Sequence, residues 1–161
     1  MPLRPPLLAV LAGAGAALVA CGDSTPPARC TPAPSATPAI AVAGPLTART
    51  DAGTVPAGGT VKVSVDAVGP LAFTAPCDAP LQLIVIDSAD LHVDALAPPA
   101  PKGTPCGPVV LPAGRTAHYE LLWTSDETLP PGRYSLVATL GDQPPLTLQV
   151  RLGPGPITCG G

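Results

Sequence analysis

Hydrophobic and polar residues alternate in short runs along the chain after residue 38. In the segment 60–68, Val61, Val63 and Val65 alternate with Lys62 and polar neighbours. A period of two places the apolar side chains on one face of a β-strand and the polar ones on the other. Residues 81–86 are more uniformly apolar, which predicts a strand buried on both faces. Together with these two, the predicted strands are residues 91–95, 118–124, 134–140 and 146–152.

Glycine and proline separate these runs, as in Val68-Gly69-Pro70 and Pro130-Pro131-Gly132. Short strands divided by turn residues at this spacing are typical of an antiparallel immunoglobulin-like β-sandwich. No segment after position 20 shows a helical period. We therefore expect residues 38–161 to form one all-β domain, with Trp123 near the centre of its core.

The composition narrows the class of protein further. The chain has 161 residues, including 25 prolines and 17 glycines, which leaves few stretches long enough for a helical bundle. Its net charge is −3 and it contains no basic cluster, which argues against a nucleic-acid partner. A hydrophobic content of 46% argues against wholesale disorder.

The N-terminal segment 1–20 has the features of an export signal. Arg4 supplies a positive charge, and an uncharged apolar run follows from Leu7 to Ala20. Such a run is too short to cross a bilayer, which takes about 20 apolar residues, but it suits the helical core of a signal peptide. The alternatives at this stage are an ordinary secretory signal and a short uncleaved anchor.

The end of the apolar run, Leu18-Val19-Ala20-Cys21, resembles the lipobox of bacterial lipoproteins. The resemblance implies that the Cys21 thiol receives a diacylglyceryl group and that cleavage makes Cys21 the mature N-terminus. The acyl chains would then attach the protein to a membrane of the cell envelope, with the domain outside the cytoplasm. Residues 21–37 are rich in Pro, Ala, Ser and Thr, which predicts an extended tether.

The remaining four cysteines are Cys30, Cys77, Cys106 and Cys159. An even number of cysteines in an exported protein predicts two disulfides, and four cysteines allow three pairings. We favour Cys77–Cys106, which flanks a strand hairpin, and Cys30–Cys159, which would tie the chain ends together. A zinc site is the alternative, but the cysteines lack CxxC spacing and lie far from both histidines.

The C-terminal half carries two turn motifs, Leu111-Pro112-Ala113-Gly114 and Leu129-Pro130-Pro131-Gly132-Arg133-Tyr134, on either side of a strand that ends at Trp123. This pattern resembles the intracellular proteinase inhibitor (BsuPI-like) family. The resemblance implies an immunoglobulin-like sandwich and, as an alternative activity, protease inhibition, but it transfers no inhibitory residue. Physically, a Pro-Gly turn fixes φ at the proline and permits positive φ at the glycine, and Tyr134 suits a tyrosine corner, so Gly132 and Tyr134 are expected to have architectural roles.

Asp87, Asp90, His92 and Asp94 form the one polar cluster that stands out in the sequence. On a strand, the last three would point the same way, so their oxygen and imidazole ligands could take a divalent cation. The alternative, which we favour, is a solvated strand face. The opposite, buried face would then consist of Leu91, Val93 and Ala95.

The sequence carries no arrangement that predicts catalysis or a bound cofactor. No serine lies in a G-x-S-x-G turn, and no glycine-rich phosphate loop precedes a helix. Asp126 and Glu127 are adjacent, so on a strand they would face apart rather than act as a pair. We therefore expect a non-enzymatic protein.

The segment from Ala97 to Pro108 is the best candidate for a binding loop. Its prolines stiffen the backbone, and Cys106 would hold one end, so the loop would lose little entropy on docking. The alternative is a solvent loop that covers an edge strand. The sequence thus predicts a lipid-anchored binding or accessory module with an unidentified envelope protein partner, or alternatively an envelope protease inhibitor. The residues expected to make contact are Pro98, Pro99, Pro101 and Lys102.

Overall fold

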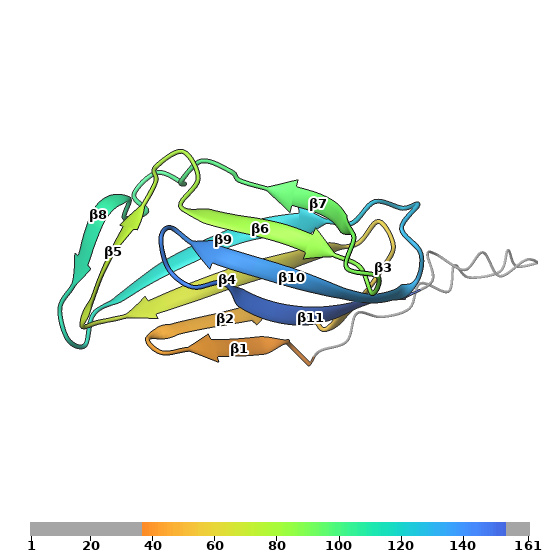
Figure 1. Cartoon of the computed structure of the whole chain (residues 1–161), viewed down its shortest axis with the longest axis horizontal. Helices are drawn as coiled ribbons and strands as arrows, with labels where there is room; N and C mark the ends of the chain where they lie inside the picture. The colour runs from red at the N-terminus through yellow and green to blue at the C-terminus, as the bar shows by residue number, and fades with distance from the viewer. Residues whose placement is uncertain (1–36, 154–161) are drawn as a thin grey trace, which may run out of the picture.

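The computed structural model describes residues 37–153, and these residues form eleven β-strands and no helix (Figure 1). Nine strands make two facing sheets, and the other two make a separate ribbon. The expected all-β sandwich is therefore confirmed. The predicted signal helix (1–20), nearly all of the tether (21–37) and residues 154–161 lie outside the described residues.

The first sheet has the order β1-β2-β4-β9 and is antiparallel throughout. Its strands are β1 (Ile40–Ala43), β2 (Leu46–Thr50), β4 (Thr60–Val68) and β9 (Thr116–Thr124). Alternate residues of β4 and β9 are buried, as the period-two pattern predicts. The pairing of β4 with β9, the edge strand of this sheet, extends over the full length of both strands.

The second sheet has the order β3-β11-β10-β6-β7. Its strands are β3 (Thr54–Pro56), β6 (Leu81–Ile86), β7 (His92–Leu96), β10 (Gly132–Leu140) and β11 (Leu146–Gly153). All its pairs are antiparallel except β3 with β11. This order, facing a sheet in which β4 lies between β2 and β9, is the strand arrangement of immunoglobulin-like sandwiches.

The core lies between the inward faces of the two sheets. Trp123 is fully buried there, as expected, and Val and Leu fill most of the remaining space. On β6 the inward residues are buried, whereas Ile84 and Ile86 on the outer face are half-buried and Gln82 is exposed. The predicted burial of this strand on both faces is therefore only partly correct. The largest fully buried side chains include Trp123, Leu46, Leu83, Leu136, Leu140, Leu148 and Leu152.

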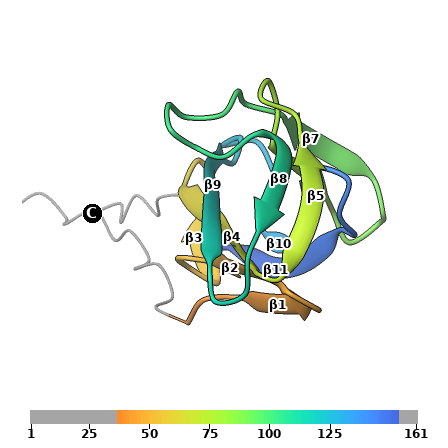
Figure 2. The same ribbon diagram turned by 90° about the vertical axis from the view of Figure 1, so that its left-hand side faces the viewer.

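The remaining strands, β5 (Leu71–Ala75) and β8 (Gly107–Leu111), form an antiparallel ribbon at one end of the sandwich (Figures 1 and 2). Phe73 packs against Tyr119 edge-to-face, with ring centroids 6.2 Å apart, and this contact joins the ribbon to the core. The turn between β10 and β11 holds the ribbon from the other side. There, Gly141 has φ +53° and lies so close to the carbonyl of Thr74 that a Cβ atom would collide with it.

The described chain begins and ends near the same point. The amide of Arg151 donates to the carbonyl of Gly53, and the carbonyl of Thr37 lies against that same glycine. In Figure 1 strand β11 runs toward the right, and the ribbon β5–β8 lies at the left, so this meeting point and the ribbon are at opposite ends of the sandwich.

The tyrosine corner expected at Tyr134 is present. The Tyr134 hydroxyl donates a 2.8 Å hydrogen bond to the carbonyl of Pro130, four residues upstream. Gly132 does not use the positive φ that a glycine permits, because β10 begins at this residue and its backbone is extended. The Pro-Gly pair therefore leads into a strand instead of forming a turn with positive φ.

Candidate binding surfaces

The proline-rich loop connects β7 with β8 and is held at several points. Cys77 and Cys106 form a disulfide at the end of the β5–β8 ribbon where Ala75 pairs with Gly107. Their Cα atoms are 4.9 Å apart, and the disulfide confirms this predicted pairing. Within the loop, the amide of Ala100 donates to the carbonyl of Cys77 at 2.9 Å. The Tyr119 hydroxyl donates to the carbonyl of Pro105 at 3.0 Å. The loop is thus fixed to both β5 and β9.

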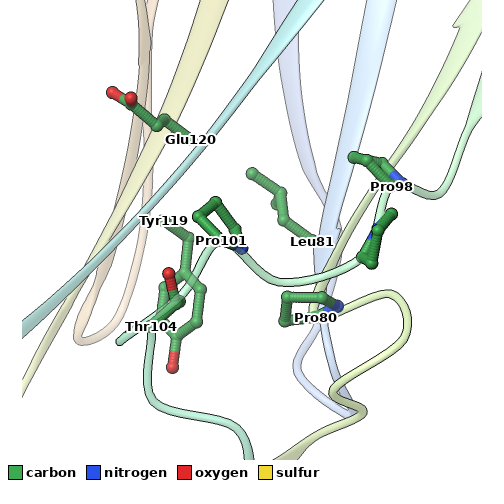
Figure 3. A pocket seen from close by; sticks show the side chains of 8 residues that line it. Pro80, Leu81, Pro98, Pro101, Thr104, Tyr119 and Glu120 are labelled. Carbon is green, nitrogen blue, oxygen red and sulfur yellow. The ribbon is translucent and has the colours of Figure 1, made fainter.

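The four predicted contact residues, Pro98, Pro99, Pro101 and Lys102, are all exposed in this loop. The three prolines also line a small pocket together with Leu81 from the second sheet (Figure 3). The pocket has a volume of about 10 Å³, room for about one water molecule. It is therefore too small to receive a side chain of a partner, and only the outer surface of the loop is free for binding.

The other cysteines of functional interest cannot be placed. Cys21, the expected lipidation site, and Cys30 and Cys159, the second predicted disulfide, lie outside the described residues. The second disulfide and the lipidation therefore stay predictions.

The candidate metal face Asp90–His92–Asp94 does not form. Asp90 lies in a turn before β7, with φ +60°, and a bulge opposite Val85 and Ile86 changes the register of the strand. Because of the bulge, His92 pairs with the outward Ile86, whereas Asp94 pairs with the inward Val85. The expected buried face also fails, since Leu91 is 63% exposed. The three side chains therefore point in different directions.

Asp94 has a structural partner instead. Its Oδ2 accepts a 2.9 Å hydrogen bond from Nε1 of Trp123, the one tryptophan of the chain. The indole is fully buried, so its N–H has no access to bulk water and needs a partner within the protein. Asp94 thus links the edge strand β7 to the first sheet across the side of the sandwich.

A second polar cluster, which the sequence analysis missed, lies on the outer face of the first sheet. Nδ1 of His118 lies 2.7 Å from Oδ1 of Asp66, and Nη2 of Arg49 lies 3.1 Å from Oδ2 of the same carboxylate. Nε2 of His118 is 3.5 Å from Oε2 of Glu120. The sequence shows these residues only as polar positions of separate strands, and the β2–β4–β9 register brings them together.

The two carboxylates determine the charge state of His118. The hydrogen bond to Asp66 raises the pKa of His118 above its ordinary 6.5, and partial burial opposes this shift. The imidazole is about half exposed, so these ion pairs stabilise the fold only slightly. We interpret this cluster as a solvated sheet face, because the side chains of Arg49, His118 and Glu120 are each about half exposed.

Among residues 37–153, no group of three or more His, Cys, Asp or Glu side chains is placed to hold a metal ion. The same residues include no helix long and apolar enough to cross a membrane.

No family model matches the sequence, and no curated protein matches it either. The resemblances to the lipobox and to the intracellular proteinase inhibitor family therefore stay hypotheses that rest on the residues alone.

Proposed function

We propose that the protein is a lipid-anchored, non-catalytic binding or accessory module of the bacterial cell envelope. The observation that carries this proposal is the lipobox-like end of the signal sequence, Leu18 to Cys21, which is followed by a Pro-rich tether and a single β-sandwich. Acyl chains on Cys21 would attach the chain to the membrane, at about 0.8 kcal/mol for each buried methylene. An immunoglobulin-like sandwich is a rigid support for binding loops.

The arrangement of the domain is compatible with such an anchor. The tether, residues 21–37, reaches at most about 60 Å when fully extended. It would join the sandwich at Thr37, which lies against Gly53 beside the last residues of β11 and so away from the β5–β8 ribbon (Figure 1). A domain tethered in this way would present the ribbon and the neighbouring proline-rich loop away from the membrane.

The anchor is tested by feeding cells a labelled fatty acid and isolating the protein. We expect the wild type to incorporate the label and Cys21→Ser to incorporate none, because the thiol is the acceptor. Equal labelling of the two proteins would contradict the anchor. Cys77→Ser is a matched control, since it removes a different thiol of the same chain and should leave labelling unchanged.

Protease inhibition is a second candidate, favoured by one observation. The exposed residues Pro98 to Lys102 lie in a loop fixed by a disulfide and two hydrogen bonds, the kind of preorganised segment with which rigid inhibitors bind. The test measures residual activity of purified serine and cysteine proteases with the full-length protein. If inhibition occurs, substitutions across Pro99–Lys102 should abolish it.

A further inference from the structure

We propose that residues Ala97–Lys102 form a preorganised polyproline ridge that inserts into an aromatic-lined groove of a partner protein, with a carboxylate of that groove facing Lys102. The inference rests on the proposed binding function and names the class of partner. The contact residues Pro98, Pro99, Pro101 and Lys102 are called the proline ridge below.

The sequence of the ridge sets its backbone conformation. The pyrrolidine ring of proline fixes the backbone angle φ, and a residue that precedes proline is restricted to extended conformations. Both constraints act across Ala97 to Pro101, so this segment favours the polyproline II helix. That helix repeats every third residue, which groups Ala97 with Ala100, Pro98 with Pro101, and Pro99 with Lys102 on its three sides.

This segment contacts the domain at Ala100, which is half-buried and whose amide bonds to the carbonyl of Cys77. Ala97 and all four residues of the proline ridge are exposed, although the three prolines also border the small pocket beside Leu81. The exposed parts of the proline rings and the lysine are therefore available to a partner.

The loop that carries the proline ridge is also fixed before any partner arrives. The Cys77–Cys106 disulfide and the bond from Tyr119 to the carbonyl of Pro105 hold the C-terminal part of the loop. A turn in which the amide of Thr104 donates to the carbonyl of Pro101 presents Lys102 at its corner. Little conformational entropy is left to lose on binding, which favours affinity.

The chemistry of the proline ridge identifies its partner. Proline rings in polyproline II segments pack into grooves lined with aromatic side chains, without needing backbone donors of their own. Lys102 is the one charged residue between Ala97 and Pro108, and it has no ion pair within the described part of the chain. A complementary groove therefore has a carboxylate where it meets this lysine.

Two other occupants do not fit. A second copy of this chain cannot supply the groove, because all four aromatic residues of the sequence are buried, with exposed fractions of 5% or less. A lipid surface is equally unsuitable, since the ridge has one cation and no large apolar side chain. The buried aromatic residues are Phe73, Tyr119, Trp123 and Tyr134.

The test is photo-crosslinking in cells that produce the full-length protein with a benzophenone amino acid at Ala97. We expect one dominant adduct, with the attachment site mapped by mass spectrometry to a partner surface rich in Trp, Tyr or Phe. The double variant Pro98→Ala/Pro101→Ala and, separately, Lys102→Glu should each reduce the adduct about tenfold or more, as the loss of a binding hot spot does.

Two matched variants control for nonspecific effects. Pro112→Ala removes an exposed proline, and Lys62→Glu reverses an exposed lysine, both on other surfaces of the domain. Neither should change the adduct at position 97. Tryptophan fluorescence of each purified variant checks that the fold is retained.

The proposal is overturned if the adduct at position 97 is absent, is insensitive to the ridge variants, or maps to a partner surface without aromatic residues. A parallel benzophenone at Leu122, exposed on the first sheet, separates this failure from that of the proposed function. An adduct from position 122 but not from 97 overturns the ridge and leaves a binding module. An adduct at 97 without fatty-acid labelling of Cys21 contradicts the anchor alone.

Discussion

The hydrogen bond between Trp123 and Asp94 allows a specific test of how the edge strand β7 is held to the sandwich. Asp94→Ala removes the carboxylate whose Oδ2 accepts the indole N–H at 2.9 Å and whose Oδ1 accepts the amide of Ala95 at 2.8 Å. The Asp94 side chain lies at the surface, so water can reach the Ala95 amide in the variant. The variant would leave the N–H of a fully buried ring without its partner.

The expected cost follows from that unpaired donor. A buried polar group left without a partner costs about 1–3 kcal/mol, and hydrogen bonds to charged groups lie in the upper part of this range. The carboxylate itself is accessible to water, which can partly replace it, so we expect about 1–2 kcal/mol. For a domain of this size, that loss lowers Tm by about 3–10 °C.

The assay is urea unfolding followed by fluorescence, which is specific because the chain has a single tryptophan. Asp94→Asn retains a carbonyl acceptor and should cost less than about 1 kcal/mol. His92→Ala, on the outward side of the same strand, should stay within about 0.5 kcal/mol of the wild type. A double-mutant cycle with Trp123→Phe separates the bond from the loss of packing; all four proteins of the cycle are followed by circular dichroism, because the Trp123→Phe variants contain no tryptophan.

A coupling energy near zero in that cycle would refute this reasoning. So would an Asp94→Ala variant as stable as His92→Ala. Either result would mean that water satisfies the indole N–H and that β7 is held by its pairing with β6 alone.

Three further predictions concern the tyrosine corner, a tight turn and the charged sheet face. Tyr134→Phe removes a buried hydrogen bond, so we expect a loss of about 1 kcal/mol in urea unfolding; an unchanged midpoint would contradict it. Gly141→Ala should cost at least about 2 kcal/mol, because a Cβ there combines a positive φ with a collision against the β5 backbone. Gly114→Ala, which has positive φ but open space around it, should cost only about 1 kcal/mol in the same assay. Because the hydrogen bond to Asp66 raises the pKa of His118 in the folded state, its stabilisation is complete below pH 6.5 and is lost as pH rises through the folded pKa. We expect the wild type to be more stable at about pH 6 than at about pH 8 by less than about 1 kcal/mol, and His118→Gln to abolish this difference.

The long strands could be predicted from the sequence because each has one buried and one solvated face. In β4, β9, β10 and β11 the alternation of side chains is local, and it matches the burial found in the structure. Strands β1, β2, β3, β5 and β8 were not predicted. They are short and contain Ala, Thr, Pro or Gly, whose burial depends on which strand lies beside them.

The candidate sites likewise divide into features that the sequence predicts and features that depend on the tertiary structure. The stiffness and exposure of the Pro98–Lys102 segment follow from its prolines. The Cys77–Cys106 disulfide belongs to the one we favoured of the three ways in which four cysteines can pair. The metal face around His92, the alternative that we did not favour, does not form because one bulge reverses the direction of Asp94, and a bulge leaves no signal in the hydrophobic pattern.

By itself, then, the sequence determined the features that depend on neighbours along the chain, namely the period of the long strands and the restricted backbone of the proline-rich loop. The tertiary structure alone decided which distant residues meet. Asp66 and His118 are 52 residues apart and Asp94 and Trp123 are 29 apart, yet each pair shares a hydrogen bond. The physical reason is that strand register and sheet packing minimise the free energy of the whole domain, and no local pattern records that choice.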